Sequence, residues 1–181
     1  MSYYAIQVLT GGESDYTRRA SPLLARGRLL APKRVLAIRK GGRKGMEESP
    51  VFPGYVFVEI DDLLASLPDY WSLRRARGFV RFLRDTASPT PLAEKDLALL
   101  RHFMSFGERA DTSKVTFDEN DRIVVLEGPL KGLEGSIVKV DRRKGRAKVA
   151  LDICETGFLI DLGFEAAEKV SRGGGPGHEE S

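Results

Sequence analysis

Alternating hydrophobic and polar positions predict β-strands over four stretches of the N-terminal half of the chain. These stretches are residues 3–9, 29–38, 47–60 and 78–83. The second and third are separated by residues 39–45 (RKGGRKG), so together they are expected to form a long hairpin with a basic, glycine-containing tip.

Apolar positions at helical spacing predict helices between and after these strands. One helix is expected to begin near Ser14 or Asp15, either of which could be its N-cap, and to end near Arg26 with a break at Pro22. The clearest helix is expected over residues 92–106, where the apolar stripe comprises Leu92, Leu97, Leu100, Phe103 and Met104.

The C-terminal part of the chain has a different pattern. Residues 107–116 are polar and have no apolar period, so they are expected to form a linker. Over residues 117–172, short apolar runs alternate with glycine-containing turns, which predicts a small closed β-barrel. The Gly-rich residues 173–181 are expected to be a disordered tail. The predicted fold class is α+β, with an antiparallel sheet flanked by helices over residues 1–106.

Basic residues are concentrated in three blocks, although the 181-residue chain has a formal net charge of only +3. Residues 26–44 contain eight Lys or Arg and no acid, and residues 74–84 contain five Arg and no acid. The third block, residues 139–148, is interrupted only by Asp141. Such segregation of charge indicates a polyanion or an acidic protein as the partner.

The sequence offers little catalytic or metal-binding chemistry. Cys154, His102 and His178 cannot form a zinc site of the usual spacing, and neither a P-loop nor a nucleophile elbow is present in the sequence. We therefore expect no enzyme activity, no metal and no cofactor. The single cysteine, together with the lack of a signal-like N-terminus or a bilayer-spanning apolar run, predicts a cytoplasmic protein with no membrane contact.

The motif FPGY precedes the most apolar strand, residues 55–60. Pro53 holds its φ angle and Gly54 allows a positive one, so the chain is expected to bend there and to present Phe52 or Tyr55 at the end of the sheet. Spacing alone favours inward packing of both rings. Exposed rings at this bend would instead be good anchors for a partner.

A second motif joins two strands of the predicted barrel. Its residues are Gly128, Pro129, Lys131, Gly132 and Gly135. The glycines allow a tight turn from which the Lys131 side chain is expected to project. Small barrels can bind nucleic acid or peptides through such turns, but surface turns are often basic for solubility alone.

With both motifs in this order, the chain resembles the NusG family of transcription elongation and antitermination factors. The resemblance extends over residues 3–170 and rests on FPGYVFVEI and DRIVVLEGPLKGLEGSIVKV. It implies a NusG N-terminal domain followed by a KOW domain with an SH3-like barrel. It also implies that the first domain binds the clamp helices of RNA polymerase and touches upstream DNA, while the barrel recruits a protein or RNA.

The resemblance also assigns site residues. Phe52 and Tyr55 fall on clamp-binding positions of the family and Val80 lies near another, so the resemblance reverses the expectation from spacing: both rings are expected to be exposed. The protein is expected to be a monomer.

Basic side chains are candidates for nucleic-acid binding. Those of the hairpin tip, which is free of acids, are expected to contact phosphates of upstream DNA or nascent RNA, although a solvated loop is the alternative. These residues are Arg39, Lys40, Arg43 and Lys44. Arg74 and Arg75 lie beside Trp71 in sequence and could bind nucleic acid, form a solvated face or stack on the indole ring.

The chain departs from the family at one functional position. Where NusG proteins usually have a Phe-Gly-Arg triplet that contacts Rho or a ribosomal protein, this chain has Cys154, Glu155 and Thr156. The basic tip, the APKR run at residues 31–34 and the IDLG sequence resemble the specialised LoaP branch of processive antiterminators.

Two alternatives remain at this point. The protein could be a ribosome- or translation-associated RNA-binding protein, because ribosomal proteins also contain SH3-like barrels with this turn. It could also be autoinhibited, with the C-terminal half refolded and covering the FPGY surface, as in one branch of the family. The density of β-branched residues favours a stable barrel over refolding.

Overall fold

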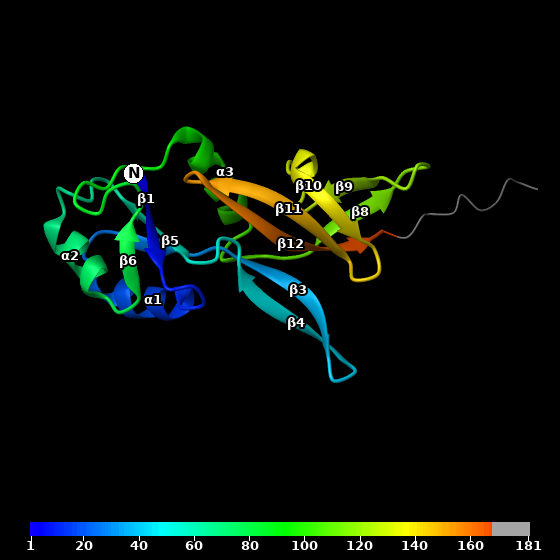
Figure 1. The fold of residues 1–181 in the computed structure, drawn as a ribbon, viewed down its shortest axis with the longest axis horizontal. Helices are drawn as coiled ribbons and strands as arrows, with labels where there is room; N and C mark the ends of the chain where they lie inside the picture. The colour runs from blue at the N-terminus through cyan, green and yellow to red at the C-terminus, as the bar shows by residue number, and fades with distance from the viewer. Residues whose placement is uncertain (168–181) are drawn as a thin grey trace, which may run out of the picture.

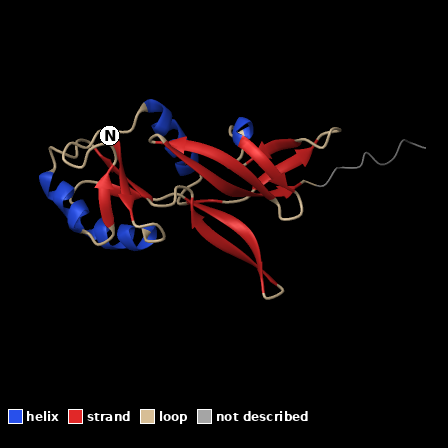
Figure 2. Cartoon of the chain, viewed as in Figure 1, coloured by secondary structure: helices blue, strands red, loops and turns tan. Residues whose placement is uncertain are grey.

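The computed structural model describes residues 1–167 (Figures 1 and 2). Its helices are α1 (Glu13–Ala20), η1 (Ser21–Leu23), α2 (Leu67–Arg75), α3 (Glu94–Met104) and η2 (Glu134–Ser136). Its strands are β1 (Ser2–Val8), β2 (Arg28–Leu30), β3 (Lys33–Lys40), β4 (Arg43–Pro50), β5 (Tyr55–Ile60), β6 (Phe79–Phe82), β7 (Arg109–Ala110), β8 (Ser113–Phe117), β9 (Ile123–Glu127), β10 (Ile137–Asp141), β11 (Arg146–Ile153) and β12 (Thr156–Ala166).

The N-terminal sheet has the strand order β2-β5-β1-β6 and is antiparallel throughout. Helices α1 and α2 cover one face of this sheet, as Figure 1 shows. The apolar cluster between them contains Ile6 and Val56 from neighbouring strands, Tyr16 from α1 and Leu73 from α2. The Tyr16 hydroxyl donates to the Leu73 carbonyl oxygen at 2.8 Å, so the two helices are also joined by a buried hydrogen bond.

The opposite face of this sheet is covered by α3 and by the C-terminal sheet. Because side chains alternate along a strand, Ala5 and Phe57 lie on this second face. They belong to one continuous apolar cluster that also contains Leu100 and Phe103 of α3. The same cluster continues into the interior of the C-terminal sheet, so the two halves of the protein share one core.

The β3–β4 hairpin leaves the N-terminal sheet and extends into solvent (Figure 1). Gly41 and Gly42 form its two-residue turn with φ angles of +60° and +77°, a conformation that favours glycine. At its base, β3 also pairs in parallel with the short strand β7.

The C-terminal sheet has the order β10-β11-β12-β8-β9 and curls into a small barrel, with β12 and β8 parallel and the other pairs antiparallel. Its interior is filled by alternate residues of the long strands, including Val149, Ile160 and Leu162. The predicted α+β class with a C-terminal barrel is confirmed.

Two of the predicted strands are each divided in the structure. Pro32, which lacks a backbone donor, separates β2 from β3, so the stretch 29–38 contributes to two sheets. The stretch 47–60 is broken at residues 51–54, which leaves β4 in the hairpin and β5 in the N-terminal sheet. Helix α1 ends at Ala20 and only the short η1 follows it, so the break at Pro22 is present but the expected end near Arg26 was wrong. The N-cap of α1 is Gly12, so the expectation of a Ser14 or Asp15 cap was wrong as well.

The segment predicted as a linker, residues 107–116, is not featureless, because it contains β7 and most of β8. Strand β7 pairs with β3, and β8 pairs with β12. These backbone hydrogen bonds do not depend on apolar side chains, so the hydrophobic pattern of the sequence did not predict the two strands. The predicted division into domains remains a prediction, and the predicted tail, residues 173–181, lies outside the described residues. Within residues 1–167, no helix is long and apolar enough to cross a membrane.

The turn after β9 contains two glycines with positive φ, Gly128 and Gly132, which differ in how closely other atoms approach them. Gly128 has a φ of +100°, and a Cβ there would lie 2.6 Å from Ser113 Cα; Gly132 has a φ of +88° and no atom within 4 Å of such a Cβ. We expect Gly128→Ala to lower the free energy of unfolding by roughly 2–4 kcal/mol, because backbone strain and steric overlap add. Gly132→Ala should lower it by roughly 1–2 kcal/mol, from strain alone.

Urea denaturation followed by circular dichroism measures both variants against the unsubstituted protein. Equal losses of stability in the two variants would contradict the close approach of β8 to this turn.

Candidate functional site

The bend at residues 51–54 is fixed by a buried carboxylate. Glu13 Oε1 accepts hydrogen bonds from the backbone N–H of Gly54 (2.6 Å) and of Gly11 (3.1 Å). Gly54 has a φ of +83°, and its carbonyl accepts a hydrogen bond from Val8 N–H at 2.8 Å. The bend is therefore a rigid support for the aromatic residues on either side of it.

Phe52 packs among rings from both halves of the protein. Its ring meets Phe57 of β5 (5.7 Å between centroids), Phe103 of α3 (5.8 Å) and Phe158 of β12 (5.8 Å), all in edge-to-face geometry. The side chain is 1% exposed, so the expectation of an exposed Phe52 is wrong for this arrangement of the chain. The physical reason is that the ring packs against Phe57 and Phe103 of the N-terminal half and is covered on a further side by Phe158 of β12.

Tyr55 is covered mainly by the barrel. Its ring meets Phe158 edge to face at 5.4 Å, and its hydroxyl lies 3.2 Å from the Thr156 hydroxyl. The residue is 8% exposed, so the expectation of exposure is wrong here as well. Unlike Phe52, Tyr55 has no aromatic partner from the N-terminal sheet or α3 within the described structure, so removal of the barrel would expose it more.

Val80, the third predicted polymerase contact, lies on the edge strand β6 and is 46% exposed. It belongs to neither of the two apolar clusters. The structure thus leaves Val80 accessible while the barrel occludes the two rings.

Several polar contacts accompany the rings between the two halves. His102 Nε2 of α3 lies 2.7 Å from the Pro129 carbonyl oxygen, and Lys95 Nζ lies 3.9 Å from Asp152 Oδ1. Arg34 of β3 donates to the Asp161 carbonyl oxygen of β12. Burial lowers the pKa of the Arg34 guanidinium, and the negative charge of Asp161 opposes this shift.

The predicted barrel turn contributes to this contact and also to the solvent-facing surface. Pro129 is buried and its carbonyl oxygen faces His102 of α3, while Gly128 packs against Ser113 of β8. Gly132 and Gly135 are exposed, and the exposed Lys131 reaches the Val125 carbonyl (3.2 Å) and Glu134 (3.9 Å).

The triplet Cys154, Glu155 and Thr156 forms the turn between β11 and β12 and lies at the contact between the halves. Cys154 and Glu155 have positive φ angles of 52° and 61°, although neither is glycine. Burial, followed by the nearby Asp96 carboxylate, raises the pKa of the Cys154 thiol to about 12, so this thiol is a poor nucleophile at neutral pH.

The basic hairpin tip is fully accessible. Arg39 lies directly opposite Lys44, and Lys40 directly opposite Arg43, and all four side chains are exposed. None of them pairs with an acid within residues 1–167. Like charges directly across a hairpin are destabilising, so these four side chains do not stabilise the tip.

The second basic candidate set is engaged in stacking. The Arg74 guanidinium lies 4.9 Å from the Trp71 ring centroid and Arg75 lies 5.7 Å from it. Arg74 also donates to the Tyr70 hydroxyl at 3.0 Å. Of the alternatives for Arg74 and Arg75, the structure shows stacking on the indole ring. The stack lies on α2, which covers the face of the N-terminal sheet opposite to the barrel (Figure 1).

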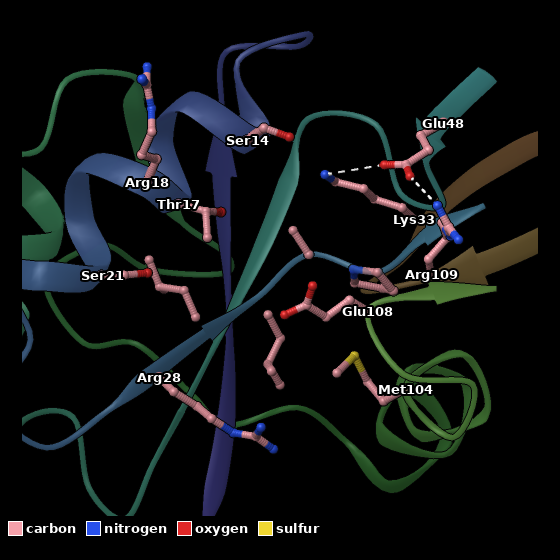
Figure 3. A pocket seen from close by; sticks show the side chains of 14 residues that line it. Ser14, Thr17, Arg18, Ser21, Arg28, Lys33, Glu48, Met104, Glu108 and Arg109 are labelled. Carbon is pink, nitrogen blue, oxygen red and sulfur yellow. Dashed lines mark hydrogen bonds and ion pairs between the residues drawn. The ribbon is translucent and has the colours of Figure 1, made fainter. Parts of the chain in front are cut away.

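A cleft of about 590 Å³ lies between α1 and β2 on one side and β3, β7 and the end of α3 on the other (Figure 3). Lys33 (3.7 Å) and Arg109 (2.8 Å) converge on Glu48, and the hydrogen bond from Arg109 lowers the pKa of that carboxyl. None of the predicted site residues lines this cleft. Within residues 1–167, no group of three or more His, Cys, Asp or Glu side chains is arranged to hold a metal ion.

Sequence reasoning missed two residues that shape the site, Phe158 and Glu13, and it did not predict the contact of Thr156 with Tyr55. Phe158 and Thr156 act across a long sequence separation, and the strand pattern around them indicated only barrel packing. Glu13 follows two glycines and has the composition of a turn residue, so nothing in the sequence marked it as buried.

Comparison with known proteins shows which family this chain is similar to. The family model described as "Transcription termination factor nusG" matches residues 1–101, and the KOW motif model matches residues 119–149. The match over residues 1–101 covers the half that a ribosomal barrel protein does not need, and it favours transcription over the translation alternative.

Curated relatives carry the name transcription termination/antitermination protein NusG. The Neisseria meningitidis protein is 25% identical over 178 residues, covering 93% of this chain and 98% of its own length. The Thermus thermophilus protein is 24% identical over 185 residues (94% and 99%), and the Escherichia coli K12 protein is 28% identical over 145 residues (80% and 78%).

The fold is also similar to that of a solved structure described as domain interaction in Thermotoga maritima NusG. That chain is 21% identical with a TM-score of 0.53, and the match covers 88% of this chain and 92% of the other. The bend with its two aromatic residues, the barrel with its glycine-containing turn and the family match over residues 1–101 lead to one conclusion: this chain belongs to the NusG family of transcription termination and antitermination factors.

Proposed function

We propose that this protein binds the clamp helices of RNA polymerase through the surface that contains Phe52, Tyr55 and Val80, and that its own barrel occupies part of this surface in the free protein. The contact of Phe158 with both Phe52 and Tyr55 carries the proposal. A surface of rigid aromatic residues at a fixed bend has the composition of a protein-binding hot spot. An intramolecular ring that covers such a surface competes with an external partner.

A partner that buries the same rings could displace the covering contact of Phe158. Each edge-to-face aromatic pair contributes about 0.5–1.5 kcal/mol beyond burial, and Phe158 makes two such pairs with the bend. The accompanying Lys95–Asp152 ion pair is largely exposed and therefore weak. Polymerase binding would repay these losses by burying the same rings against its own helices.

This form of occlusion differs from the refolding alternative. Here the C-terminal half covers the bend while it remains a barrel, with β11 and β12 paired from residue 146 to residue 163. Release of the surface would therefore not require the barrel to refold.

The remaining assignments belong to the same proposal. The hairpin tip would contact upstream DNA or nascent RNA, as its unpaired cations suggest. Arg74 and Arg75 would add contacts from the stack on Trp71. The barrel would recruit a further partner through Lys131 and the exposed part of its turn, or through the turn at Cys154 after the barrel is released. The LoaP branch assignment remains a prediction.

Substitution of Phe158 should release the barrel from the aromatic bend. Phe158→Asp places a charge against Phe52 and Tyr55 and should open the protein, which raises the competent fraction and tightens the apparent affinity for bacterial RNA polymerase by roughly tenfold or more. Leu159→Asp is the matched control, because Leu159 is the adjacent residue on β12 and is 60% exposed. Biolayer interferometry with immobilised polymerase measures both variants.

Equal affinities of Phe158→Asp and Leu159→Asp would contradict occlusion by the barrel. Transcription past a terminator, run with the same two variants, then shows whether release of the barrel also changes the activity of the factor.

The second prediction concerns the polymerase contact itself. In the closed protein, Tyr55→Ala would weaken both the polymerase contact and the barrel contact, so the substitution is best placed in the Phe158→Asp background. There we expect it to weaken polymerase binding by roughly tenfold or more, as expected for an aromatic hot spot. Leu67→Ala, which removes a 54% exposed side chain on α2, should leave affinity unchanged.

Retention of full polymerase affinity by the Phe158→Asp, Tyr55→Ala protein would show that polymerase binds elsewhere, whether or not the barrel opens.

A further inference from the structure

The barrel brings a second group of cations next to the basic hairpin. Arg146 at the start of β11 donates from Nη2 to the carbonyl oxygen of Ala37 at 2.9 Å, and Ala37 lies only two residues before Arg39 on β3. Gly163 of β12 also approaches β3 closely, since a Cβ there would lie 3.2 Å from the Val35 carbonyl oxygen. Figure 1 shows the turn between β10 and β11 on the same side of the barrel as the hairpin.

The barrel side of this junction has more positive than negative charge. Arg146 (3.7 Å) and Lys148 (2.9 Å) share the single carboxylate of Asp161, and Arg34 donates to the carbonyl oxygen of the same residue. The Nε of Arg146 is buried and has no hydrogen-bond partner within the part of the chain that the structure describes. The chain itself therefore leaves this cluster incompletely neutralised.

The same pattern of opposed like charges recurs on the barrel. Lys139 of β10 lies directly opposite Lys148 of β11, as Arg39 lies opposite Lys44 and Lys40 opposite Arg43 on the hairpin. The adjoining turn adds Arg143 and Lys144, both exposed and without an acidic partner in residues 1–167. The acids of this region are fewer: Glu47 and Glu48 lie opposite Leu36 and Val35, at the level where the barrel meets β3, and Asp141 lies opposite Arg146. Glu48 is paired with Lys33 and Arg109.

The surface lacks the groups that recognise single strands. Binding of single-stranded nucleic acid depends on exposed aromatic rings for base stacking. The exposed aromatic residues of the described chain, Trp71 and Phe106, lie on α2 and after α3, and neither belongs to the hairpin or to β10 and β11. Phe117 of β8 is half-buried, and one face of its ring is already occupied by the Arg142 guanidinium of the β10–β11 turn, 3.5 Å from the ring centroid. A surface made of cations without rings fits the phosphate backbone of a duplex.

We propose that the hairpin tip and the β10–β11 side of the barrel form one continuous surface that binds the backbone of double-stranded DNA, and that this surface exists only while the barrel is closed over Phe52 and Tyr55. This inference rests on the proposed contact of the hairpin with DNA and extends it to the barrel. Because DNA then binds the closed arrangement better than the open one, DNA and polymerase oppose each other's binding by the same factor.

The test measures binding of the full-length protein to a short fluorescein-labelled DNA duplex by fluorescence anisotropy at several salt concentrations. One variant removes the hairpin cations (Arg39→Ala, Lys40→Ala, Arg43→Ala, Lys44→Ala), and another removes barrel cations (Lys139→Ala, Arg143→Ala, Lys144→Ala). The control removes three cations from α1 and the loop after it (Arg18→Ala, Arg19→Ala, Arg26→Ala). All of these side chains are exposed.

We expect the hairpin and barrel variants each to weaken duplex binding and to reduce the salt slope by about one for each contacting side chain, while the control has little effect. Phe158→Asp and Phe158→Ala should weaken duplex binding several-fold, and Leu159→Asp should not. In the Phe158→Asp background, the barrel substitutions should lose most of their effect, since the barrel no longer lies beside the hairpin.

The possible failures are distinguishable. If the hairpin variant binds the duplex like the unsubstituted protein, the proposed DNA contact of the hairpin fails. If the hairpin variant is weakened but the barrel variant matches the α1 control, only the composite surface is overturned. Tighter duplex binding by Phe158→Asp and Phe158→Ala, or tighter binding of the single strand than of the duplex by the unsubstituted protein, would also overturn it.

Discussion

The aromatic ring of Phe158 packs edge to face against the rings of Phe52 and Tyr55, where the two halves of this protein meet. Phe158 of β12 contacts Phe52 and Tyr55 at a bend that Glu13 holds rigid through backbone hydrogen bonds. Because the rings sit in one apolar cluster that runs from the N-terminal sheet through α3 into the barrel, separating the halves exposes part of a shared core. The barrel covers Phe52 and Tyr55 in this arrangement, and we propose that its position controls which surfaces a partner can reach.

Two surfaces respond to this contact in opposite ways. Closure hides the aromatic bend, but it also places Arg146 and its neighbours beside the basic hairpin. Under the two proposals above, the protein presents an apolar surface when it is open and an extended cationic one when it is closed. In such an arrangement, a ligand that binds one surface changes the affinity of the other surface only by changing the fraction of closed molecules.

Much of the fold could be predicted from the sequence, because it depends on local patterns. The strand alternation, the helical stripe ending near Met104 and the glycine-containing barrel turn are all local signals. What the sequence could not supply was contact between distant segments: the division of the strand stretches at Pro32 and Pro53, and the cover that Phe158 gives to Tyr55. The motif drew attention to Phe52 and Tyr55, but whether these rings are exposed depends on where the barrel lies.

The most direct test of this account is a distance between the two halves. Spin labels at Ser88→Cys and Val138→Cys, both exposed sites, in a Cys154→Ser background report this distance by double electron–electron resonance. We expect one narrow, short distance between the two labels in the free protein and a longer distance when RNA polymerase is bound. A distance that stays the same on polymerase binding, or a broad distribution in the free protein, would contradict it.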